Sequence, residues 1–168
     1  MLATPAFSAS CRSCVVSPII TVRSGTTTNR IAALARQIPA SQKNTGWHQD
    51  GAFLGKDVRS VNFWLALSPC GRDAPGIDLV PRRIPYIVET GTHGAEMDWI
   101  VGPGMVDLLA QDAPVASPEF AAGDALLFDH LFLHRTSLPP NRTLDRWAIE
   151  AWMFAPSHYP MSFEPLVL

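Results

Sequence analysis

Prolines and glycines interrupt this chain so often that long helices have no room to form. The 168 residues include 15 prolines and 11 glycines, and the apolar runs between them are short. Proline removes a backbone hydrogen-bond donor inside a helix, and glycine weakens a helix because it loses more conformational freedom on folding. The chain length fits one domain with one core. The sequence therefore predicts a mainly β fold.

Residues 58–67 have the strongest strand pattern. Val61, Phe63 and Leu65 alternate with Asn62, Trp64 and Ala66, so both faces of this strand are largely apolar. Such a strand is typical of the inside of a sandwich or barrel. Further strands are expected at residues 77–80, 84–89, 125–129, 131–134 and 146–154, and one short helix at residues 105–110. Antiparallel strands with short turns and little helix predict a jelly roll, the cupin-like double-stranded β-helix.

The charge and cysteine content restrict the partners and the compartment. The formal net charge is −2, which gives no electrostatic reason to expect nucleic acid or an anionic membrane as a partner. No stretch approaches the roughly 20 apolar residues of a membrane helix. The three cysteines form no disulfide framework, since their number is odd, and this favours a reducing compartment. We expect a cytoplasmic protein whose partner is a small molecule.

The N-terminal region differs from the rest of the chain. Residues 1–49 contain no Asp or Glu, a composition that resembles an organelle transit peptide and makes an organelle the alternative location. Cys11 and Cys14 have C-x-x-C spacing, which we interpret as chance because no second pair completes a zinc site. We divide the chain into a poorly defined segment, residues 1–28, and a jelly-roll domain, residues 29–168.

His48 and Asp50 form the first half of a candidate metal site. They lie two residues apart, so on an extended chain both side chains point to the same side and can bind one ion. A third ligand must come from a distant segment, and His134 lies at the end of an apolar stretch. His130 has the same strand parity as His134 and is the alternative third ligand. A solvated turn is the alternative reading of the His48–Asp50 pair.

Two imidazoles and one carboxylate suit a particular chemistry. They leave three positions open on an octahedral metal, as in non-haem iron(II) oxygenases. One carboxylate leaves Fe(II) with a residual positive charge, which favours a dianionic co-substrate such as 2-oxoglutarate. A structural zinc site would require four ligands, mostly thiolates.

Arg146 is the candidate anchor for the second carboxylate of 2-oxoglutarate. A guanidinium binds a carboxylate bidentately and stays charged. Arg146 begins the apolar segment at residues 146–154, where an inward arginine is costly without an anionic partner. The alternative is that Arg146 faces solvent and pairs with Asp145.

Several separate motifs together resemble the phytanoyl-CoA dioxygenase family of Fe(II)/2-oxoglutarate oxygenases. They occur in family order: TGWHQDG at residues 45–51, APGIDLVPRR at 74–83, GDALLFD at 123–129, HRT at 134–136 and DRWAIEAW at 145–152. The resemblance implies a jelly-roll oxygenase that hydroxylates a small organic substrate with O₂ while 2-oxoglutarate is decarboxylated to succinate.

The resemblance also implies roles for individual residues. It makes His48, Asp50 and His134 the catalytic iron ligands and Arg146 the co-substrate anchor. Three further positions match residues that surround the co-substrate: Thr136, which helps Arg146, and Gln49 and Trp64, which line the pocket.

The short N-terminal region departs from the family pattern. Only 47 residues precede His48, whereas family members usually have a much longer region there that closes the sheet and contributes to the substrate pocket. Two alternatives therefore remain open: a cupin-type metal-binding protein and a catalytically inactive, truncated family member.

Overall fold

The computed structural model describes residues 30–43, 45–55, 57–111, 113–160 and 166–167. Its strands are β1 (Arg30–Ile38), β2 (Ser60–Ala66), β3 (Gly76–Leu79), β4 (Ala125–Asp129), β5 (His134–Ser137), β6 (Arg146–Phe154) and β7 (Leu166–Val167). Its helices are α1 (Asp50–Leu54) and α2 (Pro103–Ala110). Within these described ranges, no helix is long and apolar enough to cross a membrane.

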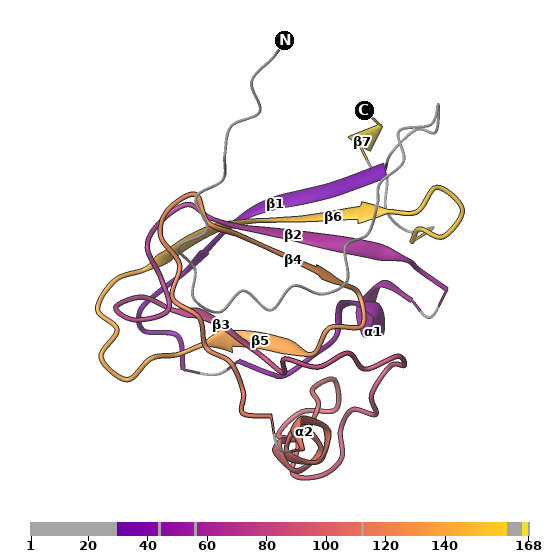
Figure 1. The fold of residues 1–168 in the computed structure, drawn as a ribbon, viewed down its shortest axis with the longest axis horizontal. Helices are drawn as coiled ribbons and strands as arrows, with labels where there is room; N and C mark the ends of the chain where they lie inside the picture. The colour runs from indigo at the N-terminus through magenta and orange to yellow at the C-terminus, as the bar shows by residue number, and fades with distance from the viewer. Residues whose placement is uncertain (1–29, 44, 56, 112, 161–165, 168) are drawn as a thin grey trace.

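The strands form two antiparallel sheets that face each other. The larger sheet has the order β4-β2-β6-β1-β7, and the smaller sheet pairs β3 with β5. Figure 1 shows the smaller sheet below the larger one, with α1 at one end of the pair and α2 beyond the smaller sheet. This mainly β, two-sheet arrangement confirms the predicted cupin-like double-stranded β-helix.

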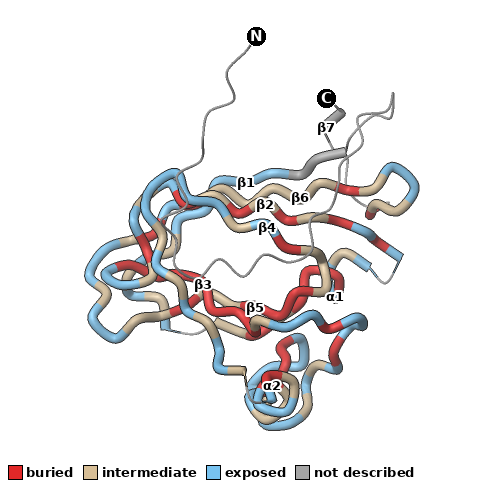
Figure 2. Tube along the Cα trace, in the orientation of Figure 1, coloured by how far each residue is buried: buried red, intermediate tan, exposed pale blue. Residues whose placement is uncertain are grey.

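The core between the sheets draws side chains from both of them. Trp64 and Ala148 come from the larger sheet, Ile77 and Leu79 from the smaller one, and all four belong to one buried cluster. Figure 2 shows β3 buried and β5 buried or half-buried, whereas β1 is exposed along much of its length. Burial of these apolar side chains is the main force that holds the two sheets together.

The alternation along β2 determines which side chains face the site. Ser60, Asn62, Trp64 and Ala66 are buried, and the residues between them are half-buried. The predicted two-sided apolar strand is therefore confirmed, with Asn62 and Trp64 on the inner face. Both lie in the pocket that contains the candidate metal ligands.

Most of the predicted elements are present. Residues 146–154 form β6 at the predicted bounds, and residues 125–129 form β4. The predictions for β2, β3 and α2 are correct to within two residues.

Two predicted strands differ from the structure. Residues 84–89 form no strand, because the carbonyl of Tyr86 and the N–H of Val88 are bonded to the side chain of Gln49 rather than to a neighbouring strand. Pro85 also lacks a donor for such pairing. Residues 131–133 form a turn and a loop, and strand β5 begins only at His134. Strand β1 and helix α1 were not predicted.

The boundary between residues 28 and 29 remains a prediction, since residues 1–29, with Cys11 and Cys14, lie outside the described ranges. We expect a chain that lacks residues 1–28 to keep its fold, because that segment has neither a periodic pattern nor a continuous apolar face. Thermal unfolding of the shortened chain is the measurement. A fall in Tm of more than about 10 °C would show that the segment is part of the folded domain.

Candidate metal centre

Backbone pairing places the two histidines directly opposite each other. The N–H of His48 donates to the carbonyl of His134 at 2.9 Å, and the N–H of His134 donates to the carbonyl of His48 at 3.0 Å. This short antiparallel bridge continues β5 toward the H-x-D segment. The two imidazole rings lie 4.4 Å apart, centroid to centroid. The long sequence separation between the histidines is therefore closed by main-chain bonds.

Asp50 reaches the same point from the first turn of α1. Gln49 is extended, with φ −118° and ψ 134°, and Asp50 is the first helical residue. The N–H of Gly51 donates to the carbonyl of His130 at 2.8 Å. A Cβ atom at Gly51 would lie 2.8 Å from the end of the Ile87 side chain and 3.0 Å from that carbonyl, so a larger residue would push these neighbours apart.

The three side chains converge as a metal site requires. One ligand atom from each of His48, Asp50 and His134 lies within 4.8 Å of the other two. His134 and Asp50 are buried, and His48 is half-buried. Small side-chain movements would bring all three atoms to the roughly 2 Å typical of such metal–ligand bonds. The donor set fits Fe(II), and the structure agrees with the predicted convergence.

Each imidazole is oriented by a backbone carbonyl. Nδ1 of His48 lies 2.8 Å from the carbonyl of Gly46, and Nδ1 of His134 lies 2.9 Å from that of Phe132. A carbonyl can only accept, so each Nδ1 carries the proton and each Nε2 presents a lone pair. The pKa of His134 is lowered to about 4, mainly by burial and also by the charge of His48, while Asp50 and the hydrogen bond to Phe132 oppose the shift. His134 is therefore a neutral ligand near pH 7.

The carboxylate of Asp50 is also held in place. Its Oδ2 accepts hydrogen bonds from Nδ2 of Asn62 and from Nε1 of Trp152, each at 2.9 Å. Its Oδ1 lies 3.8 Å from Nε2 of His134. The two donors therefore occupy one oxygen and leave the other for a metal.

We expect Asn62→Leu to weaken Fe(II) binding by about tenfold, because loss of a group that orients a metal ligand typically costs 10–100-fold in affinity. Leucine approximates the shape of asparagine, and it also removes Oδ1 of Asn62, a buried acceptor with no partner among the described residues. Metal titration is the measurement. Ser60→Ala is the matched control, since Ser60 is buried on the same face of β2 and its hydroxyl also lacks a described partner. Equal affinities would contradict the orienting role.

His130, the alternative third ligand, lies outside the cluster. Its Nδ1 is 3.5 Å from the N–H of Ser60, and its carbonyl holds Gly51. It is not among the described residues whose ligand atoms meet. The structure brings His134, and not His130, to His48 and Asp50.

Arg146 points inward and is buried. It is 2% exposed, its Nη1 donates to the carbonyl of Gly76 at 2.6 Å, and its guanidinium lies 5.4 Å from the ring centre of Trp64. Nε has no hydrogen-bond partner in the described chain, and Nη2 has only the carboxylate of Glu150 at 3.9 Å. Burial lowers the pKa of Arg146, and the attraction of Glu150 opposes that shift.

The orientation of Arg146 decides between the two alternatives raised by the sequence. Asp145 accepts hydrogen bonds from Gln37 and from the N–H of Ala40, so it is not the partner of Arg146. The Nε–Nη2 edge of the guanidinium is free for a bidentate acceptor.

The triad and Arg146 share one cavity of about 290 Å³. Trp64 and Thr136 also line it, as do Ile77 and Phe128. Gln49 does not. Its amide bonds the carbonyls of Tyr86 and Leu131 and the N–H of Val88, which ties two loops together.

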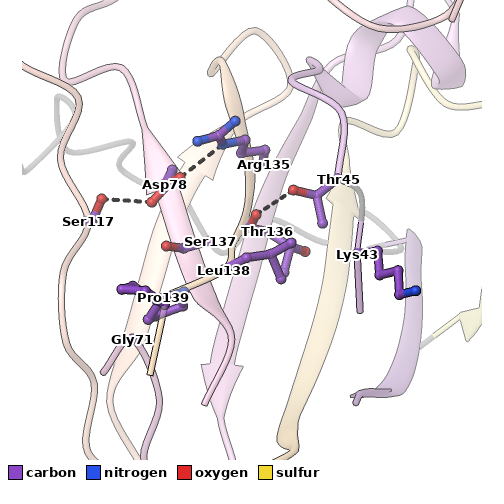
Figure 3. A pocket seen from close by; sticks show the side chains of 11 residues that line it. Lys43, Thr45, Gly71, Asp78, Ser117, Arg135, Thr136, Ser137, Leu138 and Pro139 are labelled. Carbon is purple, nitrogen blue, oxygen red and sulfur yellow. Dashed lines mark hydrogen bonds and ion pairs between the residues drawn. The ribbon is translucent and has the colours of Figure 1, made fainter. Parts of the chain in front are cut away.

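A second pocket, of about 440 Å³, borders the smaller sheet and contains none of the three ligands. Figure 3 shows Asp78 there between Ser117 and Arg135, and the hydroxyl of Thr45 donating to the carbonyl of Thr136. The polar groups of Asp78 are thus already paired. We assign this pocket no role.

Sequence reasoning missed three pocket residues. Asn62 and Trp152 orient Asp50, and Glu150 lines the cavity beside Arg146. A signal was present in each case: Asn62 shares the parity of Trp64 on β2, and Glu150 and Trp152 share that of Arg146 on β6.

Solved structures with the same fold include oxygenases. ThoJ, described as a non-heme monooxygenase in its apo form, matches with a TM-score of 0.60 and 15% identity over 84% of this chain and 53% of its own. EvdO2 from Micromonospora carbonacea var. aurantiaca, complexed with 2-oxoglutarate, matches with a TM-score of 0.54 and 14% identity over 84% and 54%. This chain therefore spans about half the length of these proteins. At such identity the likeness shows the fold.

Among curated protein sequences no match was found. The model of one family, phytanoyl-CoA dioxygenase, matches residues 1–147. The match includes the first 28 residues, which contain none of the motifs that carry the resemblance. It covers the H-x-D motif, His134 and Arg146, and it extends over most of the chain. The chain belongs to the phytanoyl-CoA dioxygenase family.

Proposed function

We propose that this chain is a non-haem Fe(II)/2-oxoglutarate-dependent dioxygenase that hydroxylates a small organic substrate. One observation carries the proposal: the His48, Asp50 and His134 cluster and the free edge of Arg146 lie in the same cavity. A metal triad alone fits many proteins. A buried guanidinium in the same pocket, whose Nε has no described hydrogen-bond acceptor and whose only described carboxylate neighbour is 3.9 Å away, favours an anionic ligand as well.

His48, Asp50 and His134 would hold the iron. Two neutral imidazoles and one carboxylate would leave it a single positive charge and three open positions. The carbonyls behind each Nδ1 and the two donors to Asp50 fix the ligands before the metal arrives. Hydrogen bonds of this kind raise metal affinity because the ligand side chains lose less conformational freedom when the metal binds.

Arg146 would anchor the distal carboxylate of 2-oxoglutarate through Nε and Nη2. Its surroundings favour a bidentate pair, because Trp64 and Ile77 exclude water from that part of the cavity and a dry site strengthens charge-assisted hydrogen bonds. The hydroxyl of Thr136, on the adjacent strand β5, lines the same cavity and is the candidate second donor.

When bound, iron and 2-oxoglutarate together supply the oxidation of a substrate C–H bond by O₂, with succinate and CO₂ formed from the co-substrate. The contribution of this chain is to hold the metal ligands, the co-substrate anchor and the substrate in fixed positions in one pocket. A cytoplasmic location, inferred from the cysteine content, belongs to the same proposal.

The test is succinate formation by the purified chain. Protein supplied with Fe(II), 2-oxoglutarate and O₂ is expected to produce succinate slowly even without added substrate, and omission of any one component should stop production. If the protein binds Fe(II) but neither binds nor consumes 2-oxoglutarate, a cupin-type metal-binding protein becomes the better assignment. If it binds both and makes no succinate, the inactive family member does.

A further inference from the structure

Glu150 is a half-buried carboxylate in the metal cavity that the proposed chemistry does not use. It lies on β6 between Arg146 and Trp152, and its side chain is 12% exposed. One of its oxygens, Oε1, lies 3.7 Å from Arg36 and 3.9 Å from Arg146. Both distances exceed a hydrogen bond. No group in the described part of the chain donates a hydrogen bond to this carboxylate.

Only a small part of this carboxylate reaches solvent, since its side chain is 12% exposed, so few water molecules can donate to it. A donor that enters the cavity therefore finds an acceptor there. Arg146, whose Nη2 lies 3.9 Å from Glu150, is assigned to 2-oxoglutarate in the proposed function. Arg36 has a side chain that is 47% exposed, so water competes for its guanidinium. The acceptor capacity of Glu150 is therefore available to a ligand in the cavity.

The charges around Glu150 favour a neutral donor. Two guanidinium groups already compensate its negative charge, and an ammonium placed beside it would meet both of them. An anionic substrate would in turn be repelled by Glu150, and it would lack the direct contact with Arg146 that the proposed function gives to 2-oxoglutarate. A hydroxyl group donates a hydrogen bond without adding charge, so it fits this environment better than either ion.

Phe53 and Trp99 form an aromatic pair in the lining of the same cavity. Their ring centroids are 6.0 Å apart, and Phe53 lies 5.5 Å from the ring of His48. Phe53 is 55% exposed and Trp99 is 46% exposed. Exposed aromatic faces beside a metal site provide a surface for the C–H-bearing face of a ring, because the negative π-face attracts the positive ends of C–H bonds.

We propose, on the basis of the proposed function, that the substrate is a neutral, hydroxyl-bearing ring compound. One of its hydroxyl groups donates to Glu150, and its apolar face packs on Phe53 and Trp99. Glu150 is then a specificity-determining residue. The hydrogen bond to Glu150 and the contact with Phe53 and Trp99 together hold the compound beside the iron ligands.

The experiment measures binding of three probes to the anaerobic Fe(II)·2-oxoglutarate protein by saturation-transfer NMR. The probes are methyl β-D-glucopyranoside, its per-O-methylated derivative, which keeps the ring but has no donors, and cyclohexylamine as the ammonium form. We expect the glucoside to bind at least tenfold more tightly than the other two.

Two substitutions at Glu150 test whether its carboxylate recognises the substrate or only supports the fold. Glu150→Leu is expected to weaken glucoside binding at least tenfold, while Glu150→Gln, which still accepts a hydrogen bond, loses less. Phe53→Ala should also weaken it. Glu119→Gln is the matched control, since Glu119 is 61% exposed, pairs with Arg72 and lies outside the cavity.

Separate readouts distinguish this inference from the proposed function. 2-Oxoglutarate affinity should be unchanged or higher in Glu150→Leu, because a competing anion near Arg146 is removed. Absence of glucoside binding to the wild type, equal binding by the wild type and Glu150→Leu, or Glu150-dependent preference for cyclohexylamine would each overturn the substrate class. Failure of the wild type to bind 2-oxoglutarate would instead overturn the proposed function.

Discussion

Replacing His134 with alanine is expected to abolish Fe(II) binding or to weaken it at least tenfold. The substitution removes one of three ligands and leaves His48 and Asp50, which lie two residues apart and cannot fix an octahedral geometry alone. Main-chain bonds between residues 48 and 134 do not depend on the side chain, so the fold should survive. Titration with Fe(II), or with Mn(II) as a stable substitute, is the measurement.

His130→Ala is the matched control for that experiment. His130 is the histidine that sequence parity alone cannot distinguish from His134, and the structure keeps it outside the ligand cluster. Its alanine variant should bind metal as the wild type does. If instead His134→Ala binds normally and His130→Ala does not, the third ligand has been misassigned.

The strands that can be predicted from the sequence are those whose own residues show a hydrophobic pattern typical of strands. β2 alternates buried and half-buried residues, so periodicity finds it, and β6 is found as an apolar run that begins after a polar turn. β1, with the sequence RIAALARQI, is rich in residues that favour helices. It is a strand because it pairs with β6 over nine residues, and such pairing overrides local propensity.

The candidate site divides in a similar way. His48, Asp50, His134 and Arg146 could be predicted because their residue types and motif order carry chemical meaning. Strand parity alone does not separate His130 from His134, since a turn at residues 130–131 changes which of them continues into β5, and the prediction of His134 rested on the motif order. Gln49 matched a family position, yet in this structure its amide is used by three backbone groups. Side-chain bonds of that kind depend on loops that sequence patterns do not position.

Strand β6 connects the parts of the site. It lies between β2 and β1 in the larger sheet, so neighbours on both sides fix its register. Arg146, Glu150 and Trp152 all line the cavity, and they serve in turn the proposed co-substrate, the proposed substrate and the ligand Asp50. A change of register by one residue would turn all three away from the cavity.

Arg146→Leu separates a 2-oxoglutarate oxygenase from a cupin-type metal protein. The substitution removes the cation expected to anchor the distal carboxylate and leaves the three metal ligands in place, so Fe(II) affinity should hardly change. 2-Oxoglutarate binding should weaken by roughly 2–4 kcal/mol, or about thirty-fold to a thousand-fold, as for loss of one side of a buried, hydrogen-bonded charge pair. Leucine suits an apolar strand, and it removes a buried guanidinium whose Nε has no described partner.

The measurement is 2-oxoglutarate titration of the anaerobic Fe(II) protein, followed by its metal-to-ligand charge-transfer absorbance. Arg72→Leu is the control, since it also removes one positive charge but from a side chain that is 72% exposed and paired with Asp73. That variant should bind 2-oxoglutarate as the wild type does. If Arg146→Leu also binds it equally well, the buried guanidinium does not anchor the co-substrate. Without that anchor, the triad supports a metal-binding jelly roll and no more.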